Sequence, residues 1–143
     1  PGIVDIGAKV CEPGERHKES FRSAGLSAAA GGVTTLITRP DTNPAVDSPE
    51  TLEFANRRAQ ATCAVRSYQM AALTKGRLGK EMTEIGFLQD AVAIAFSECD
   101  AVVTNTKVLA RALTYARGTR MENNGERQLL AAVITRQGGG KRT

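Results

Sequence analysis

The sequence predicts an α/β fold built on parallel strands. Short runs rich in β-branched residues alternate with segments of helical periodicity about four times, at a spacing of roughly 30 residues, which is typical of strand–helix–strand units. The run at residues 33–38 is nearly continuous in β-branched residues, as a strand buried on both faces would be. The 143 residues are 41% apolar and 24% charged, which are values typical of a globular domain. We therefore expect parallel strands joined by right-handed helical crossovers.

The first half of the chain contains two of these units. Residues 1–14 open with a short apolar run that ends in an acid, Asp5, followed by mixed residues and a Pro-Gly turn, an order that predicts a buried first strand opening into a loop. Residues 15–30 carry apolar side chains at helical spacing, and Gly31-Gly32 ends that helix. Residues 33–38 predict a second buried strand. Ser48 is a predicted N-cap with Pro49 at the first position of a helix whose buried stripe is Leu52, Ala55, Ala59 and Thr62.

The second half repeats the pattern less regularly. Residues 64–73 predict a strand that two polar side chains interrupt, and residues 74–80 a glycine-rich loop. We expect Thr83 to cap a short helix, residues 92–96 to form a fourth strand, and Asn105 to cap a helix that ends at Gly118. Residues 119–143 differ in character, with a short apolar run at 129–135 that fits a strand or a helix. We expect residues 1–118 to form the folded part, and 119–143 a partly flexible tail.

Composition excludes several functional classes. The net charge of +4 is spread along the chain and only 4% of residues are aromatic, so we expect no nucleic-acid binding. No apolar run approaches the roughly 20 residues that span a bilayer, and the opening residues lack the charged, apolar and small-residue order of a signal peptide, so we expect no membrane association. The three cysteines are widely spaced, which favours reduced thiols in a cytoplasmic protein. The glycine-rich tail departs from the phosphate-binding loop pattern at Thr135 and Arg142.

Several sequence blocks, in order, resemble one enzyme family. The opening residues 1–14 resemble Pro-Gly-x-x-Asp-x-His-x-His-x-Arg-Glu-Pro-Gly, with which dihydroorotases of the amidohydrolase superfamily begin their barrel. Residues 28–35 are similar to the family's Ala-Ala-Ala-Gly-Gly-x-Thr-Thr, and residues 39–44 to its Met-Pro-Asn-Thr-Asn-Pro loop. Residues 72–76, 79–84 and 92–97 match further blocks. The resemblance covers roughly residues 1 to 117.

The resemblance implies a fold and a chemistry. Dihydroorotases are (β/α)8 barrels that interconvert N-carbamoyl-aspartate and dihydroorotate in pyrimidine biosynthesis, with zinc that activates water and polarises the amide. About four βα units would make half of such a barrel. We therefore expect a partial TIM barrel with two open strand edges and an uncovered inner face, which favours association into oligomers.

The same resemblance shows that the metal ligands are replaced. The two histidines of the first strand fall on Gly7, which has no donor atom, and on Lys9, which would bring a cation to a cation's site. The chain contains one histidine, His17, which we interpret as an exposed residue of a helix face. We therefore expect no catalytic residue, no metal site and no cofactor, in contrast to the zinc of active family members.

Four further positions correspond to the family's substrate and ligand positions, and we predict them to mark a degenerate substrate pocket. Cys11 takes the place of the arginine that binds the substrate carboxylate, and Asp41 takes the place of an asparagine. Asn43 is unchanged, although a turn residue needs no functional reason. Glu98 falls where bacterial members carry an acidic metal ligand; without partner ligands we interpret it as a solvated loop carboxylate.

Two functions fit these replacements. In some bacteria, dihydroorotase-like proteins that have lost their histidines assemble with aspartate carbamoyltransferase, and the pattern of loss here resembles theirs. The alternative is a truncated or altered amidohydrolase that acts on cyclic amides, which the start at Pro1 and the unusual tail suggest.

Overall fold

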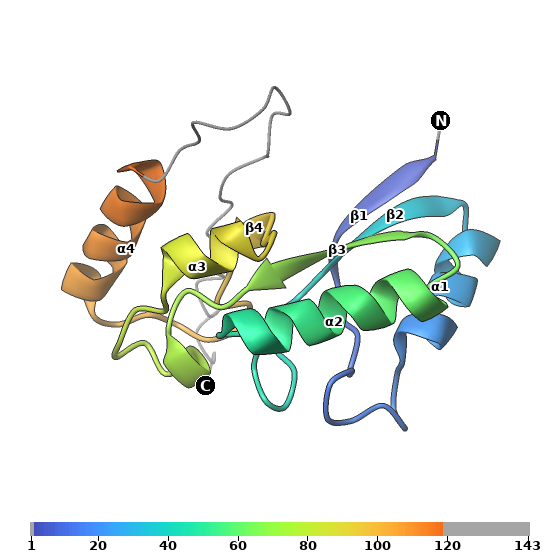
Figure 1. Ribbon diagram of the computed structural model, residues 1–143, viewed down its shortest axis with the longest axis horizontal. Helices are drawn as coiled ribbons and strands as arrows, with labels where there is room; N and C mark the ends of the chain where they lie inside the picture. Colours follow the sequence, from blue (N-terminus) through green and yellow to red (C-terminus); the bar gives the residue numbers. More distant parts are fainter. Residues whose placement is uncertain (1, 119–143) are drawn as a thin grey trace, which may run out of the picture.

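The computed structural model describes residues 2–118, and it confirms the expected half barrel (Figure 1). Four parallel strands form one curled sheet in the order β1-β2-β3-β4. The strands are β1 (Ile3–Ala8), β2 (Val33–Thr38), β3 (Arg66–Ala71) and β4 (Ala95–Phe96). The helices are α1 (Phe21–Ala30), α2 (Pro49–Thr62), the 3-10 turn η1 (Lys75–Arg77), α3 (Ile85–Asp90) and α4 (Thr106–Gly118).

One face of the sheet is covered and the other is not. Helix α1 packs on β2 and α2 packs on β3, and both lie on the same side of the sheet in Figure 1. Ile6, Ile37 and Tyr68 are aligned across β1, β2 and β3, so they share a face. Ile6 is 58% exposed and Tyr68 is 44% exposed, so this face, the inside of a closed barrel, is open to solvent.

The first strand is therefore not the buried strand that its composition predicts. Ile3, Val4 and Ile6 are 61%, 54% and 58% exposed. Within residues 2–118, β1 has a partner on one side only, β2, because it stands at the edge of the sheet. An apolar edge strand of this kind is normally covered by further structure.

The main core lies between β3, β4 and the helices α2, α3 and α4. It is formed by buried side chains that come mostly from strand ends and helix faces: Val46, Leu52, Ala71, Leu73, Ile85, Leu88, Ala93, Phe96, Ala112 and Ala116. A second cluster of Val10, Phe21, Ala55 and Ala59 joins α1 to α2. Among residues 2–118, no helix combines the length and the apolar character needed to cross a bilayer.

Two predicted helix caps are confirmed, and both are local in sequence. The Ser48 side chain accepts a hydrogen bond from Thr51 N–H, and Pro49 occupies the first turn of α2. Asn105 Oδ1 accepts from the N–H groups of Lys107 and Val108 at the start of α4. These hydroxyl and amide caps satisfy N–H groups that the helix itself leaves unpaired.

Other predicted boundaries are wrong. Helix α1 begins at Phe21 and not near Glu15, because Ser20 caps it by accepting from Ser23 N–H. Thr83 does not cap α3, since its buried hydroxyl donates to the carbonyls of Ala72 and Leu73 at 2.9 and 3.1 Å.

The fourth strand is also shorter than the predicted residues 92–96, because only Ala95–Phe96 pair with β3. Val92 has a φ of +69°, which no extended strand adopts. The third strand is shorter at both ends than the predicted residues 64–73. The predictions for residues 119–143, including the apolar run at 129–135, lie outside the described residues.

Candidate functional site

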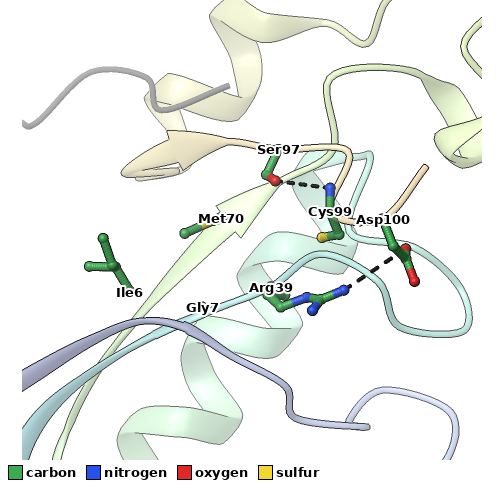
Figure 2. A pocket seen from close by; sticks show the side chains of 7 residues that line it. All are labelled: Ile6, Gly7, Arg39, Met70, Ser97, Cys99 and Asp100. Atoms are coloured by element: carbon green, nitrogen blue, oxygen red, sulfur yellow. Dashed lines mark hydrogen bonds and ion pairs between the residues drawn. The ribbon is translucent and has the colours of Figure 1, made fainter. Parts of the chain in front are cut away.

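The strand ends surround a pocket of about 230 Å³ on the uncovered side of the sheet (Figure 2). Parallel strands place all their carboxyl ends at one edge, which is where barrel enzymes hold their active sites. The pocket is lined by residues from the ends of all four strands and the loops that follow: Ile6, Gly7, Arg39, Met70, Ser97, Cys99 and Asp100.

A buried carboxylate joins the ends of β1 and β2. Asp41 is held by Arg39 in a bidentate contact, with Nε to Oδ1 at 3.2 Å and Nη2 to Oδ2 at 2.8 Å. Lys9 Nζ lies 3.1 Å from the same Oδ2. Arg39 N–H also donates to the carbonyl of Ala8 at 3.0 Å, which fixes the first residue after β2 against the end of β1. Asp41 therefore carries two cationic partners.

The charges continue to the ends of β3 and β4. Asp100 accepts a hydrogen bond from Arg77 of η1, and its Oδ1 lies 3.9 Å from Arg39 Nη2. Arg77 Nη2 also donates to the carbonyl of Glu98 at 2.9 Å. The strand ends thus carry a row of alternating charges, in the order Lys9, Asp41, Arg39, Asp100 and Arg77. The hydrogen bond from Arg77 is the main cause that lowers the pKa of Asp100.

Arg39 lies at the centre of this row of charges. Burial lowers the pKa of Arg39, but the charge of Asp41 and the hydrogen bonds that Arg39 makes to Cys99 and Asp41 raise it by more, so the pKa is raised overall. Burial and the negative charge of Asp41 raise the pKa of the Cys99 thiol, although Arg39 acts in the opposite direction. Cys99 is therefore a neutral thiol at pH 7, and it has a φ of +56° that turns the chain after β4.

These residues do not fit the zinc that the resemblance implies. Gly7 lines the pocket without a donor atom, and the Lys9 ammonium is paired with Asp41. A metal there would have to compete with a lysine and an arginine for one carboxylate. Within residues 2–118, no three His, Cys, Asp or Glu side chains gather as a metal site would require. His17 is exposed, as expected, but it lies in a turn before α1 and not on a helix face.

Glu98 is not the solvated carboxylate that the sequence predicts. It is 1% exposed, and its Oε1 accepts a hydrogen bond from Thr74 N–H after β3. Its Oε2 is buried without a hydrogen-bond partner among the described residues. Burial is the largest influence and raises the pKa of Glu98, while Thr74 lowers it. Glu98 therefore holds the loop after β3 and is absent from the pocket lining.

Two other predicted positions are not brought to the pocket. Cys11 lies in the loop after β1, where its N–H donates to Glu19 and its carbonyl accepts from Glu15. Asn43 is exposed in the loop after β2. Of the four predicted substrate positions, Asp41 is bonded through its side chain to the pocket-lining Arg39, and Glu98 lies between the lining residues Ser97 and Cys99 with its side chain turned to Thr74.

The retained Glu-Pro-Gly part of the opening motif has a structural role. Glu12 is buried, with Oε2 accepting from Phe21 N–H at 3.1 Å and Oε1 from Arg58 Nε at 2.7 Å. It therefore ties the loop after β1 to the start of α1 and to α2. A Cβ on Gly14, which has a φ of +99°, would lie 1.7 Å from the carbonyl oxygen of Asn43. Only glycine allows the loops after β1 and β2 to pack this closely.

The residues of the candidate site that the sequence alone does not indicate are Arg39, Arg77, Cys99 and Asp100. One signal was available for Arg39, because it takes the place of a methionine in the family's loop. Three changes, to Lys9, Arg39 and Asp41, introduce charges of opposite sign at neighbouring strand ends. Read together, they would have predicted an ion pair.

Comparison with known proteins places these observations in a family. Residues 1–122 match the family model described as dihydro-orotase-like. The chain is 39% identical over 117 residues to a protein named dihydroorotase from Caldicellulosiruptor saccharolyticus, which covers 82% of this chain and 27% of that protein. It is 39% identical over 116 residues to a protein named dihydroorotase-like protein from Pseudomonas putida, covering 81% and 27%.

A solved structure agrees on the fold. The L-hydantoinase (dihydropyrimidinase) of Arthrobacter aurescens superposes with a TM-score of 0.69 at 23% identity, over 83% of this chain and 27% of that one. Identity this low supports the barrel fold alone. The chain thus spans 27% of the length of these relatives.

Proposed function

The chain belongs to the dihydroorotase-like family, and from this premise we propose that it is a cytoplasmic, catalytically inactive dihydroorotase-like protein of pyrimidine biosynthesis. We propose further that it acts as an assembly partner of aspartate carbamoyltransferase.

The ion pair between Lys9 and Asp41 carries the proposed loss of activity. Lys9 stands at a histidine position of the family's metal site, and Asp41 stands at an asparagine position of its substrate site. Their atoms lie 3.1 Å apart, so each residue is engaged by the other. The Lys9 ammonium has no lone pair to offer a metal, and Asp41 has no N–H to donate to the carboxylates of N-carbamoyl-aspartate, so both replacements oppose the family's reaction.

The retained architecture supports a role in assembly. Glu12 and Gly14 still fix the loops after β1 and β2, although those loops hold no metal ligand set. The apolar side chains of β1 remain exposed within the described residues, as a contact surface would be. Aspartate carbamoyltransferase is the proposed partner because the histidine-depleted proteins that this chain resembles assemble with that enzyme.

The partner proposal is tested by mixing the chain with aspartate carbamoyltransferase and measuring the mass of the complex by light scattering after gel filtration. We expect a complex that Ile3→Lys on β1 weakens at least tenfold. Leu26→Lys on α1 is the matched control, since Ile3 and Leu26 are 61% and 57% exposed and neither variant disturbs the core. If the two proteins elute separately, the partner is wrong.

Turnover in the same samples tests the inactivity separately. We expect no ring closure of N-carbamoyl-aspartate, with or without added zinc and with or without the partner. Zinc-dependent turnover would establish the alternative, an altered amidohydrolase acting on cyclic amides, whatever the outcome of the mixing experiment.

A further inference from the structure

Asp41 is held as a bound carboxylate ligand would be. The guanidinium of Arg39 meets both oxygens, at 3.2 and 2.8 Å, in the planar two-point contact that arginine makes with carboxylates. Lys9 adds a second cation at 3.1 Å from Oδ2. Two cations from two strand ends thus converge on one carboxylate, which the chain itself supplies.

The side chain of Asp41 is much less exposed than those of its two cationic partners, Arg39 and Lys9. The Asp41 side chain is 3% exposed, whereas Arg39 is 28% and Lys9 is 56% exposed. Arg39 also lines the pocket, beside Cys99 and Asp100 (Figure 2). The carboxylate is therefore covered, while Lys9 remains reachable from solvent and Arg39 from the pocket.

We propose that Arg39 and Lys9 form a binding seat for a small carboxylate, and that Asp41 occupies this seat and so excludes carboxylate ligands from the adjoining pocket. The seat is distinct from the family's substrate contacts, since Arg39 takes the place of a methionine and the arginine position is Cys11. The inference does not rest on the proposed loss of catalysis, because occupancy of the seat is measured by binding alone.

Asp41 competes for Arg39 and Lys9 more strongly than a free carboxylate does, because it is part of the same chain. It is two residues from Arg39 and is already ordered, so its binding costs no translational entropy, whereas a free carboxylate loses translational entropy on binding. Removal of Asp41 leaves a partly buried guanidinium without its two-point partner. The vacated space next to Arg39 and Lys9 then corresponds to the carboxyl group that was removed, and formate has that size and charge.

The test is chemical rescue of Asp41→Ala by sodium formate, followed by thermal unfolding of the full chain. We expect saturable stabilisation in the millimolar range for this variant, with sodium chloride at equal ionic strength as the salt control. Formate should not stabilise the unsubstituted protein in a saturable manner, and Arg39→Met combined with Asp41→Ala should abolish the rescue.

Asp47→Ala is the matched control variant. Asp47 lies in the same loop and accepts a hydrogen bond from Gly76 N–H at 2.7 Å, but it has no ion pair among the described residues. Formate should therefore not rescue it. Equal rescue of both variants would mean a nonspecific salt effect and would overturn the proposal.

A second variant and a second measurement cover the case in which Asp41→Ala fails to fold. Asp41→Ser keeps a small polar side chain, and its Arg39 Nε–H resonance can be followed by NMR during a formate titration. A saturable shift in Asp41→Ser that is absent from the unsubstituted chain supports the seat. A folded variant whose Arg39 resonance does not move with formate would refute it.

Discussion

A lysine in place of a metal ligand and an aspartate in place of a substrate-binding asparagine would each introduce an unbalanced charge at the strand ends. Here Lys9 and Asp41 lie 3.1 Å apart, and Arg39 completes the neutralisation from the next strand. Replacing Lys9 or Arg39 alone would leave the buried Asp41 carboxylate with one cationic partner, and replacing Asp41 alone would leave the partly buried Arg39 guanidinium without its two-point partner. The three substitutions are therefore best understood as one compensated change.

Glu98 gives a pH-dependent prediction at the same scale. Its pKa is raised by burial in the folded protein, so the folded state binds more protons than the unfolded state above about pH 4.5. The free energy of unfolding should then fall as the pH rises through the window between the two pKa values. Glu98→Gln cannot titrate and still offers an oxygen to Thr74 N–H.

We expect the stability of Glu98→Gln, relative to the unsubstituted protein, to increase from about pH 4.5 towards neutrality. Urea unfolding at a series of pH values measures this difference directly. Parallel stability curves for the two proteins would show that the buried carboxyl does not titrate in this range, and would contradict the account of Glu98.

Single residues were the part of the site that the sequence predicted least well. Asp41 was identified because a known motif named its position. Cys99 and Asp100 have no such motif, and they reach the pocket because Cys99 adopts a positive φ after a two-residue strand. The burial of Glu98 cannot be predicted from its neighbours in the sequence, because it depends on the loop after β3, which is distant in sequence.

The elements were predicted well where their determinants are local. Ser48 and Pro49 lie next to the helix that they begin, so α2 could be predicted from a few adjacent residues. The starts of α1 and α3 depend in addition on contacts across the preceding loops. Glu12 accepts a hydrogen bond from the first N–H of α1, and the Thr83 hydroxyl donates to the carbonyls of Ala72 and Leu73, just after β3. Periodicity does not report such contacts.

The loop after β1 provides the prediction at the scale of elements. Gly14→Ala should destabilise the protein by about 2–4 kcal/mol, because its Cβ would collide with the Asn43 carbonyl at a positive φ. Gly32→Ala is the control: its φ is +78° but nothing lies within 4 Å of the added Cβ, so about 1–2 kcal/mol of backbone strain is expected.

Chemical denaturation measures both free energies of unfolding. If the two alanine variants lose the same stability, the loops after β1 and β2 do not pack as closely as described. A larger loss at Gly14 would establish that this contact, and not backbone strain alone, keeps the opening motif's Pro-Gly turn in place.

The overall fold of residues 2–118 was predicted most securely. Four alternations of strand and helix specify a parallel sheet, and parallel sheets with right-handed crossovers leave few topologies. Exposure of β1 contradicts its apolar composition and follows from the curled sheet's open edge. The composition of a strand indicates which side chains are apolar enough to be buried. Whether they are buried depends on the strands and helices that pack against it.

At this scale we propose that the strand ends keep the barrel's geometry without its metal chemistry. The most direct measurement is the zinc content of the chain after saturation with zinc and removal of the unbound metal, determined by mass spectrometry. A dihydroorotase with both histidines, treated identically, serves as the positive control. We predict far less than one zinc per chain; one tightly bound zinc per chain that Lys9→Met or Asp41→Ala removes would contradict the claim.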